Sequence, residues 1–238
     1  TDDDVAGFTV AETDGSTGVD ESGTTDIITV VLNAQPVSDV VMAISSSDAS
    51  ETAVNGSTAN NNSLTFTSEN WDTPQSFTVT GVDDDLVDGT VNSILTISVV
   101  DALSDNGFDA VADQTVTAST TDDDVAGFTI DQLDGSIEVD ESGDTDTFTV
   151  VLDAQPTSDV VITITSSDTG EATVTSTLTF TPANWDTPQV ATITGVDDDI
   201  IDGSQTSTIT VSIDDANSDD DFDAIADQTV SVSTTDDD

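Results

Sequence analysis

The chain has 238 residues, of which 50 are Asp or Glu and none is Lys, Arg or His, so its formal net charge is −50 at pH 7. Nucleic acids and anionic membrane surfaces are bound through basic side chains, and the composition therefore excludes both as direct partners. Cysteine is also absent, which excludes disulfides, thiolate metal sites and thiol redox chemistry.

The acidic chain is nevertheless expected to fold, because 34% of its residues are apolar and they occur in short β-branched runs. No apolar stretch has the length of a membrane span, and no signal peptide begins the sequence. We therefore expect a fragment of a longer protein that has hydrophobic cores of its own.

The sequence contains two copies of one unit. The nonapeptide TDDDVAGFT occupies residues 1–9 and again 121–129, and ESG, AQP and NWDTPQ recur in the same order. The offset between the copies falls from 120 to 114 residues across one loop, at residues 55–63, which is longer in the first copy. This pattern predicts two domains, residues 5–124 and 125–238.

In chain order, each copy reads as a series of short strands that alternate apolar and polar residues between Gly, Pro, Asp or Asn. About seven such strands per copy predict an all-β fold, a two-sheet Greek-key sandwich of immunoglobulin-like type. The strand-like segments 113–120 and 125–130 follow each other without a Gly/Ser/Pro linker, so we expect the two sandwiches to stack end to end. In the second copy, the side chains expected to face the core are Phe148, Val150, Leu152, Val160, Ile162, Ile164, Leu178, Phe180, Ile193, Ile209, Val211, Ile213, Val230 and Val232.

Acidic residues gather at the expected strand ends, in four places per copy: a lone Glu, a lone Asp, a run of three Asp with a fourth beyond it, and a terminal run of three Asp. If these places share one pole of the sandwich, each close pair of carboxylates costs on the order of 4 kcal/mol at an effective dielectric of about 20. Protonation of so many groups is disfavoured at pH 7, and the chain has no basic side chain to offset them. The sequence therefore predicts a metal site of oxygen ligands alone, for which flexible carboxylates favour Ca²⁺ over Mg²⁺.

A second interpretation of the acids stays open, in which they form solvated faces like those of proteins from salt-loving organisms. Scattered acids such as Asp14, Asp26, Asp39 and Asp72 fit this interpretation best. The sequence has neither an EF-hand loop nor a glycine-rich nonapeptide array, so a calcium site would have to be assembled from distant segments.

The order of these acids resembles the Calx-β domain, a family found in sodium/calcium exchangers and in very large bacterial surface adhesins. The resemblance rests on ESG, on the lone Asp after a Ser run, on GVDDDLVDG and on the terminal DDDVAG, and it covers both copies almost completely. It implies calcium ligands at one pole of each copy, which are Glu21, Asp48, Asp83, Asp84, Asp85, the carbonyl of Leu86, Asp88, Asp122, Asp123 and Asp124 in the first copy, and Glu141, Asp168, Asp197, Asp198, Asp199, the carbonyl of Ile200, Asp202, Asp236, Asp237 and Asp238 in the second.

One position departs from the family. A further acid three residues beyond Asp88 is replaced by Val91 in the first copy and by Gln205 in the second. We therefore expect one or more calcium ions per domain and leave their number open.

The tandem arrangement and the SDxxFDAxADQT segments at 104–115 and 218–229 look most like the repeated extender region of a bacterial surface adhesin. The resemblance implies an extracellular, monomeric spacer for cell adhesion and biofilm formation, with neighbouring repeats as partners and with calcium stiffening the poles and the junction. The acids of those segments, Asp105, Asp109, Asp113, Asp219, Asp223 and Asp227, could hold another ion, but a polar loop anchored by Phe108 and Phe222 is favoured.

Two other functions remain open, a calcium sensor of exchanger type and a ligand-binding adhesin module that uses the variable loop at residues 55–63. An enzyme is not expected, because the sequence lacks His, Cys, Lys, Arg, Tyr and any nucleotide-binding fingerprint. Trp71 and Trp185 share one sequence context, which indicates structural corner residues rather than a sugar-binding platform.

Overall fold

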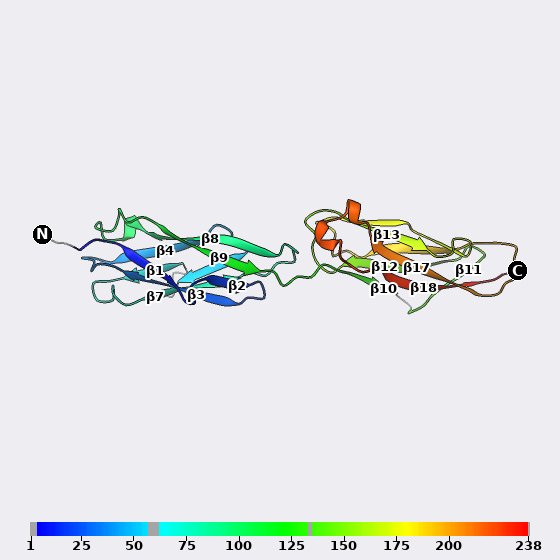
Figure 1. Ribbon diagram of the computed structural model, residues 1–238, viewed down its shortest axis with the longest axis horizontal. Helices are drawn as coiled ribbons and strands as arrows, with labels where there is room; N and C mark the ends of the chain where they lie inside the picture. Colours follow the sequence, from blue (N-terminus) through cyan, green and yellow to red (C-terminus); the bar gives the residue numbers. More distant parts are fainter. Residues whose placement is uncertain (1–3, 57–61, 133–134, 238) are drawn as a thin grey trace. The chain divides into compact units, whose positions relative to one another are not determined.

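The computed structural model describes residues 4–56, 62–132 and 135–237 (Figure 1). It divides into a first unit, Thr1–Asp84 with Asp88–Asp123, and a second unit, Asp85–Val87 with Asp124–Asp238. Most of the variable loop at residues 55–63 lies outside the described residues. No helix among the described residues is both long and apolar enough to cross a membrane.

The first unit is a sandwich of a four-stranded sheet, in the order β1-β3-β7-β5, and a five-stranded sheet, in the order β2-β9-β8-β4-β6. Its elements are β1 Phe8–Glu12, β2 Thr17–Asp20, β3 Thr25–Leu32, β4 Val40–Ser46, β5 Thr52–Gly56, β6 Ser63–Phe66, β7 Gln75–Gly81, β8 Thr90–Val99, the short 3-10 helix η1 Asp101–Leu103, and β9 Gln114–Thr121.

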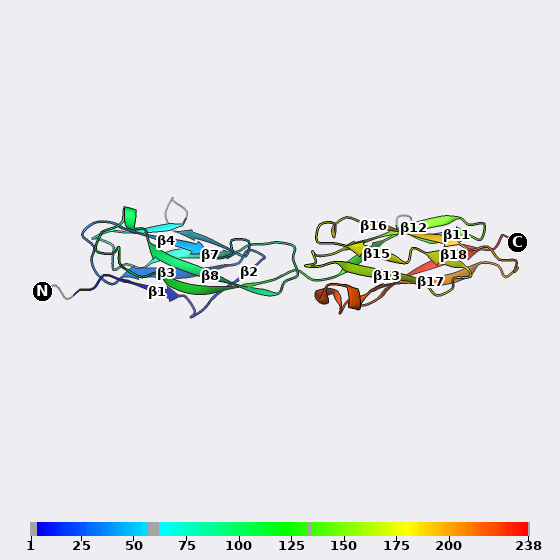
Figure 2. The same ribbon diagram turned by 90° about the horizontal axis from the view of Figure 1, so that it is seen from above.

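The second unit repeats this topology, with the sheets β10-β12-β16-β14 and β11-β18-β17-β13-β15 (Figure 2). Its elements are β10 Phe128–Asp131, β11 Ile137–Asp140, β12 Thr145–Leu152, β13 Val160–Ser166, β14 Ala172–Val174, β15 Thr177–Phe180, β16 Gln189–Gly195, β17 Gln205–Ile213, the 3-10 helices η2 Asp215–Asn217 and η3 Asp220–Phe222, and β18 Gln228–Thr235.

The predicted two-sheet β-sandwich is confirmed, with more strands per copy than expected. Each unit has nine described strands because two short ones were not anticipated, β2 and β5 in the first unit and β11 and β14 in the second. Strand β11 continues from β10 but changes sheets and pairs in parallel with β18, while β14 pairs with β16. Three to five residues are too few for an alternating pattern to stand out in the sequence.

The alternating pattern predicted the core correctly. All fourteen side chains expected to face inward in the second copy are buried in the structure. Each unit has one hydrophobic cluster of its own, and Trp71 and Trp185 lie partly buried at the edges of these clusters.

Strand pairing decides which loops meet at each end of a sandwich. In the first unit Thr90 of β8 pairs with Thr121 of β9, and Thr52 of β5 pairs with Gly81 of β7. The end of β2, the start of β5, the end of β7, the start of β8 and the end of β9 therefore lie at one end, which we call the acidic pole. The opposite end, where β8 ends and β9 begins, is called the loop pole, and the same names apply to the second unit.

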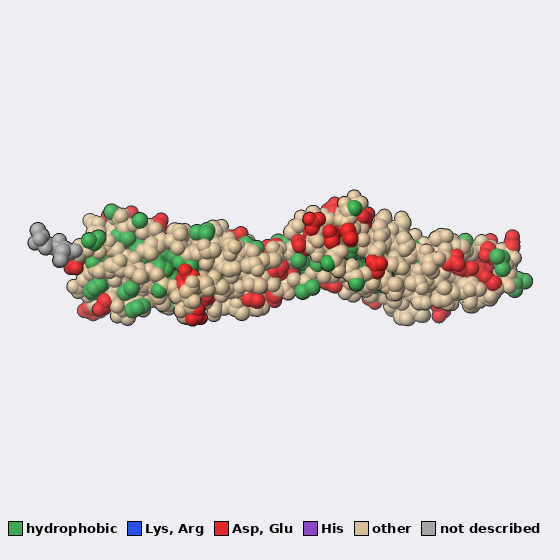
Figure 3. Space-filling view, viewed as in Figure 1, with side chains coloured by type: hydrophobic (Ala, Val, Ile, Leu, Met, Phe, Trp, Pro, Cys, Tyr) green, Lys and Arg blue, Asp and Glu red, His purple; other side chains and the backbone are tan. Residues whose placement is uncertain are grey.

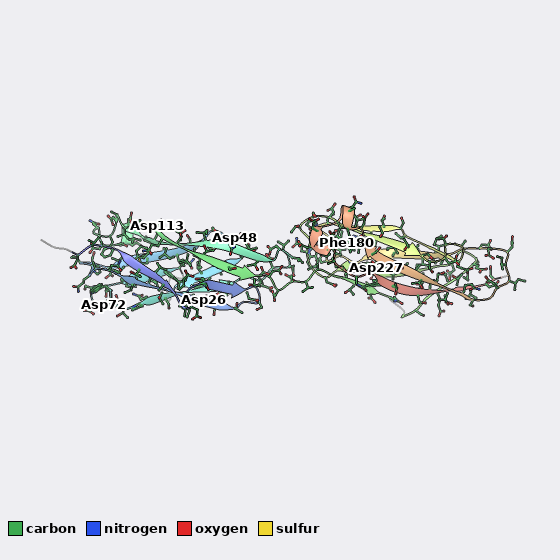
Figure 4. All side chains as sticks on the ribbon, in the orientation of Figure 1. Asp26, Asp48, Asp72, Asp113, Phe180 and Asp227 are labelled. Carbon is green, nitrogen blue, oxygen red and sulfur yellow. The ribbon has the colours of Figure 1, made fainter. Side chains whose placement is uncertain are left out.

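Figure 4 shows this division in the first unit. Asp48, which follows β4, lies toward the acidic pole, whereas Asp72 and Asp113 lie toward the loop pole. On the face of the molecule shown in Figure 3, acidic side chains gather in separate groups and no basic side chain is present.

Candidate metal centre

Two buried glutamates lie at each acidic pole and come from opposite sheets. Glu21 follows β2 and Glu51 precedes β5 in the first unit, and Glu141 and Glu171 take the same places in the second. Their side chains are exposed by only 1%, 5%, 1% and 8%, respectively. Ionised glutamates are almost never buried to this degree without a partner.

Backbone pairing fixes both positions. Strand β2 runs parallel to β9 and delivers Glu21, whose backbone N–H donates to the carbonyl of Thr121 at 3.0 Å. The carbonyl of Glu51 accepts from the backbone N–H of Val82 at 2.9 Å, which joins this residue to the end of β7.

Glycine at the end of β7 allows the two sheets to approach. A Cβ built on Gly81 would lie 2.0 Å from the carbonyl oxygen of Asp20, and one on Gly195 would lie 1.9 Å from that of Asp140. Any side chain at these positions would push β7 or β16 away from the glutamate that follows Asp20 or Asp140.

The buried glutamate oxygens lack hydrogen-bond donors. Both carboxylate oxygens of Glu21, and one oxygen (Oε2) on each of Glu51, Glu141 and Glu171, are buried without a hydrogen-bond partner among the described residues. Leaving a buried acceptor unsatisfied costs about 1–3 kcal/mol, and more for a charged group. The fold therefore holds these four side chains in a state that the polypeptide alone does not stabilise.

Burial and neighbouring charges also disfavour the ionised forms of the buried glutamates. Burial raises the pKa of Glu21 to about 7, and the nearby charges of Asp122 and Asp84 add to the effect. Burial is also the main cause of a raised pKa at Glu51, followed by the charges of Asp88 and Asp84. Two ionised carboxylates have no donor between them, so neither glutamate can satisfy the other.

The second unit repeats these shifts. Burial raises the pKa of Glu141, with the charge of Asp236 next in importance, and it raises the pKa of Glu171, with the charge of Asp202 next. Each acidic pole therefore disfavours the charged forms of its own buried glutamates.

Aspartates at the end of the last strand organise the neighbouring loop. In the first unit the Oδ2 atom of Asp122 accepts from the backbone N–H groups of Asp88 and Gly89 at 3.0 and 2.8 Å. Gly89 has a φ of +76°, a conformation that favours glycine and turns its N–H toward Asp122.

The same arrangement occurs in the second unit. The Oδ2 atom of Asp236 accepts from the backbone N–H groups of Asp202 and Gly203 at 3.0 and 2.7 Å. The loop after β7 or β16 is thereby held beside the buried glutamates.

Carboxylate oxygens from distant segments meet at these poles. Among the described residues of the second unit, Glu141, Glu171 and Asp202 each place one oxygen within 4.8 Å of the others. In the first unit an oxygen of Glu21 lies within 4.8 Å of one from Asp122. Hard oxygen donors without nitrogen or sulfur suit Ca²⁺, and the donor-free glutamate oxygens fit such an ion, which would be held by Glu141, Glu171 and Asp202.

The runs of three aspartates alternate in exposure. After β7 and β16 the middle residues Asp84 and Asp198 are half-buried, whereas Asp83, Asp85, Asp197 and Asp199 are exposed. The carboxylate oxygen Oδ1 of Asp198 accepts from the backbone N–H of Ile200 at 2.7 Å.

The next positions differ between the copies. Asp85 and Leu86 belong to the second unit, where the carbonyl of Asp85 accepts from the backbone N–H of Gln155 at 2.7 Å. Leu86 is half-buried, whereas its counterpart in the second copy, Ile200, is exposed.

The terminal runs also alternate. Asp122 and Asp124 are half-buried and Asp123 is exposed, while in the second copy Asp236 is half-buried and Asp237 is exposed. Asp238 lies outside the described residues.

The lone aspartates have a structural role in the turn before each second glutamate. The Oδ1 atom of Asp48 accepts from the backbone N–H and the hydroxyl of Ser50 at 3.1 and 2.5 Å, and these bonds lower its pKa. Asp168 accepts from the N–H of Gly170 at 3.0 Å. Both aspartates thus position the glutamate that lies three residues beyond them.

Sequence reasoning missed Glu51 and Glu171. A signal was present, because Asp48-Ala-Ser-Glu51 recurs as Asp168-Thr-Gly-Glu171 at the same offset of 120 residues as the other motifs. Each of these glutamates is a single acid outside the runs of three, and its burial depends on the short strand β5 or β14 that follows it.

At the loop pole the acids accept hydrogen bonds from the backbone, in keeping with the expected polar loop anchored by phenylalanine. Phe108 and Phe222 are buried in the two cores. The carboxylate of Asp105 accepts from the backbone N–H groups of Val37, Ser38 and Gly107 at 2.6–2.9 Å. These bonds support a loop anchor rather than an additional ion site.

No protein-family model matches the sequence, and no curated protein matches it. Among solved structures, the chain is similar to the calcium-binding domain CBD12 of CALX1.1, at 16% identity and a TM-score of 0.32, with 85% of this chain and 79% of that chain covered. It is also similar to the S-layer protein SbsC, at 12% identity and a TM-score of 0.38, with 98% and 29% covered. A protein of unknown function from Porphyromonas gingivalis W83 gives 9% identity and a TM-score of 0.31, with 97% and 96% covered. The first of these is a calcium-binding domain of the kind that the sequence resembles, but at these TM-scores no likeness carries an argument about this chain.

Proposed function

We propose that this protein is a calcium-binding structural module, one part of the extender region of a bacterial cell-surface adhesin. The observation that carries the proposal is the pair of buried glutamates at each acidic pole, each with at least one buried carboxylate oxygen that has no hydrogen-bond partner among the described residues, in a chain without Lys, Arg or His. Apart from protonation, a cation from solution is the remaining source of positive charge.

Calcium suits these poles better than other metals. Zinc, copper and iron sites generally use nitrogen or sulfur ligands, and the chain contains neither His nor Cys. Ca²⁺ accepts about six to eight oxygen ligands in flexible geometry, whereas Mg²⁺ requires a strict octahedron and gives up its waters reluctantly. Carboxylates that converge from separate loops therefore favour calcium.

The solvated-face interpretation accounts for only part of the acids. Exposed residues such as Asp83, Asp123 and Asp197 are well hydrated and need no ion. Glu21 and Glu141 are 1% exposed, so bulk water does not solvate their charges.

A mechanical role accounts for the repetition better than a sensor does. A sensor needs one switch, whereas a spacer gains length and stiffness from each added copy. In this proposal calcium also stiffens the junction around residues 122–124. The protein acts outside the cell and performs no catalysis. Calcium at about 10 times its Kd would stabilise each site by about 1.4 kcal/mol.

Calorimetric titration of the intact chain with calcium, and with magnesium as a control, tests the proposal. We expect calcium to bind with a Kd of about 10⁻⁴–10⁻³ M, as for extracellular modules. X-ray scattering should then show a stiffer chain with calcium than with chelator. Absence of calcium binding would refute the proposal, a Kd of about 10⁻⁷–10⁻⁵ M would favour the sensor, and unchanged scattering would refute the stiffening.

A further inference from the structure

The second unit includes a short segment that precedes the rest of it in the chain. Asp85–Val87 belong to this unit, although its continuous part begins at Asp124. Leu86 forms a parallel β-bridge with Gln155, which lies between β12 and β13 at the loop pole. The N–H of Gln155 donates to the carbonyl of Asp85 at 2.7 Å, and its carbonyl accepts from the N–H of Val87 at 3.3 Å. The loop pole of the second unit thus binds an extended segment through backbone hydrogen bonds.

The first unit has the same loop in an exposed state. Gln35 is the counterpart of Gln155 and is exposed, whereas Gln155 is half-buried. The side-chain amide of Gln35 donates to the carbonyl of Ser68 at 2.8 Å, but its backbone N–H and carbonyl have no hydrogen-bond partner among the described residues. A pocket of about 280 Å³ lies beside this backbone, and its apolar lining comes from Ala6, Ala34, Pro36, Val37 and Phe108.

A segment complementary to this loop is exposed at the acidic pole of the second unit. Residues 199–201 follow β16 as residues 85–87 follow β7. Ile200 and Ile201 are 59% and 82% exposed, while their counterparts Leu86 and Val87 are half-buried. Within the described part of the chain, the carbonyl of residue 199 and the N–H of residue 201 have no hydrogen-bond partner.

We propose that the loop pole of the first unit is a docking site for residues 199–201 of a second copy of this chain, so that chains associate head to tail. In the docked complex the N–H of Gln35 donates to the carbonyl of Asp199, and the carbonyl of Gln35 accepts from the N–H of Ile201. These are the bonds that Asp85–Val87 make with Gln155 in the second unit. The inference goes beyond the proposed function, because it concerns association between chains rather than metal binding.

The side chains of residues 199–201 suit the pocket at Gln35. Ile200 and Ile201 replace Leu86 and Val87, so an aliphatic pair is kept, and docking would remove its apolar surface from water. The contact is small, and both chains are strongly acidic, so we expect a weak and transient association. Salt favours it, because the Debye length falls to about 3 Å at about 1 M ionic strength. A head-to-tail contact leaves one free docking site at each end and can therefore be repeated.

Disulfide exchange between two single-cysteine variants detects such a contact, because the chain has no cysteine of its own. Paired strands lie about 4.7–4.9 Å apart, within the Cα separation of about 4.4–6.8 Å that a disulfide spans. Intact chains carrying Gln35→Cys or Ile200→Cys are mixed in equal amounts in a glutathione buffer with about 1 M salt, once with calcium and once with chelator. The matched control mixes Gln35→Cys with Val190→Cys, because Val190 is 54% exposed and lies on β16, away from residues 199–201.

Random exchange makes half of all disulfide-linked dimers mixed. We expect the mixed dimer of Gln35→Cys and Ile200→Cys to exceed this share and to be several-fold more abundant than the mixed dimer of the control. Adding Ile201→Pro to the Ile200→Cys chain should abolish the excess, because proline has no N–H to donate to Gln35. Its melting temperature should stay unchanged, because the N–H of Ile201 has no partner within the described part of its own chain.

An excess of the mixed dimer with calcium or with chelator supports the inference. A random share under both conditions, or the same share as in the control, overturns it and leaves the proposed calcium binding standing. An excess that survives Ile201→Pro contradicts the backbone pairing at Gln35. A chain with both Leu86→Cys and Gln155→Cys should form an internal disulfide, and its failure to do so would overturn the contact on which the inference is based.

Discussion

Asp219 and Glu171 are acids of the second sandwich that are both more than nine-tenths buried, at the loop pole and the acidic pole respectively. Asp219 accepts hydrogen bonds from the hydroxyl of Thr157, the backbone N–H and hydroxyl of Ser158, and the N–H of Asp221. Glu171 has an oxygen without any partner among the described residues.

The pKa values of the two acids move in opposite directions. Burial alone would raise the pKa of Asp219, but the hydrogen bonds from Thr157 and Ser158 bring it below its usual value. Burial raises the pKa of Glu171, and the charges of Asp202 and Asp168 raise it further. Donors therefore separate an acid whose charge is offset by the fold from an acid whose charge the described residues leave without a donor at one oxygen.

Closing the space between the sheets should disrupt the acidic pole most strongly. Gly195→Ala places a Cβ 1.9 Å from the carbonyl oxygen of Asp140, and the backbone must shift to relieve this contact. We expect a loss of about 3 kcal/mol in the free energy of unfolding, together with weaker calcium binding, as measured by denaturant unfolding and calcium titration. Gly170→Ser, which gives the second copy the residue found at Ser50 in the first, should have little effect on either quantity.

Removing the charge of Asp219 should weaken the loop pole and leave the acidic pole intact. Hydrogen bonds to charged groups contribute about 1.5–3 kcal/mol, so Asp219→Asn should lower the free energy of unfolding by about 2 kcal/mol. The exposed Asp227 of the same loop pole provides the control Asp227→Asn. If the loss from Asp219→Asn depended on calcium, the assignment of this acid as a loop anchor would be wrong.

A smaller loss of stability is expected when the hydrogen bond between Thr52 and Thr120, which joins the sheets in the first unit, is removed. The hydroxyls of Thr52 and Thr120 lie 3.1 Å apart, whereas the second copy has Ala172 in place of Thr52. Thr52→Ala should cost about 1 kcal/mol, because Thr120 keeps its bond to the carbonyl of Glu51 at 3.3 Å. Denaturant unfolding measures the change, and a cost above about 3 kcal/mol would show that this contact matters more than a single hydrogen bond.

The effect of pH on stability through Asp219 at the loop pole should be smaller still. Because the pKa of Asp219 is lower in the folded protein than its usual 3.8, its contribution is fully present above pH 3.8 and is lost as the pH falls through the folded-state pKa. Melting temperatures of the wild type between about pH 5 and pH 2 should fall more steeply than those of Asp219→Asn. Parallel slopes would contradict the lowered pKa.

The fold could be predicted from the sequence because long strands alternate regularly. Residues such as Phe148, Val150 and Leu152 are apolar at every second position, and all are buried. The short strands β11 and β14 have no such repetition, so their existence, and the change of sheet between β10 and β11, became visible only in the structure.

The candidate site could be predicted in part. Glu21 and Glu141 were identified from the resemblance, and the structure places both at the acidic poles. A run of three aspartates does not reveal which member is partly buried, and the alternation that leaves Asp84 half-buried and Asp83 exposed depends on the backbone after β7. Glu51 was missed because its burial requires β5 to pair with β7, a long-range contact that no local pattern encodes.

Crystals of the protein grown with calcium would test the central claim most directly. The account predicts an ion between the carboxylates of Glu141 and Glu171, with oxygen distances of about 2.3–2.6 Å. Water alone at this position, or a direct hydrogen bond between the two carboxyl groups in the presence of millimolar calcium, would contradict it.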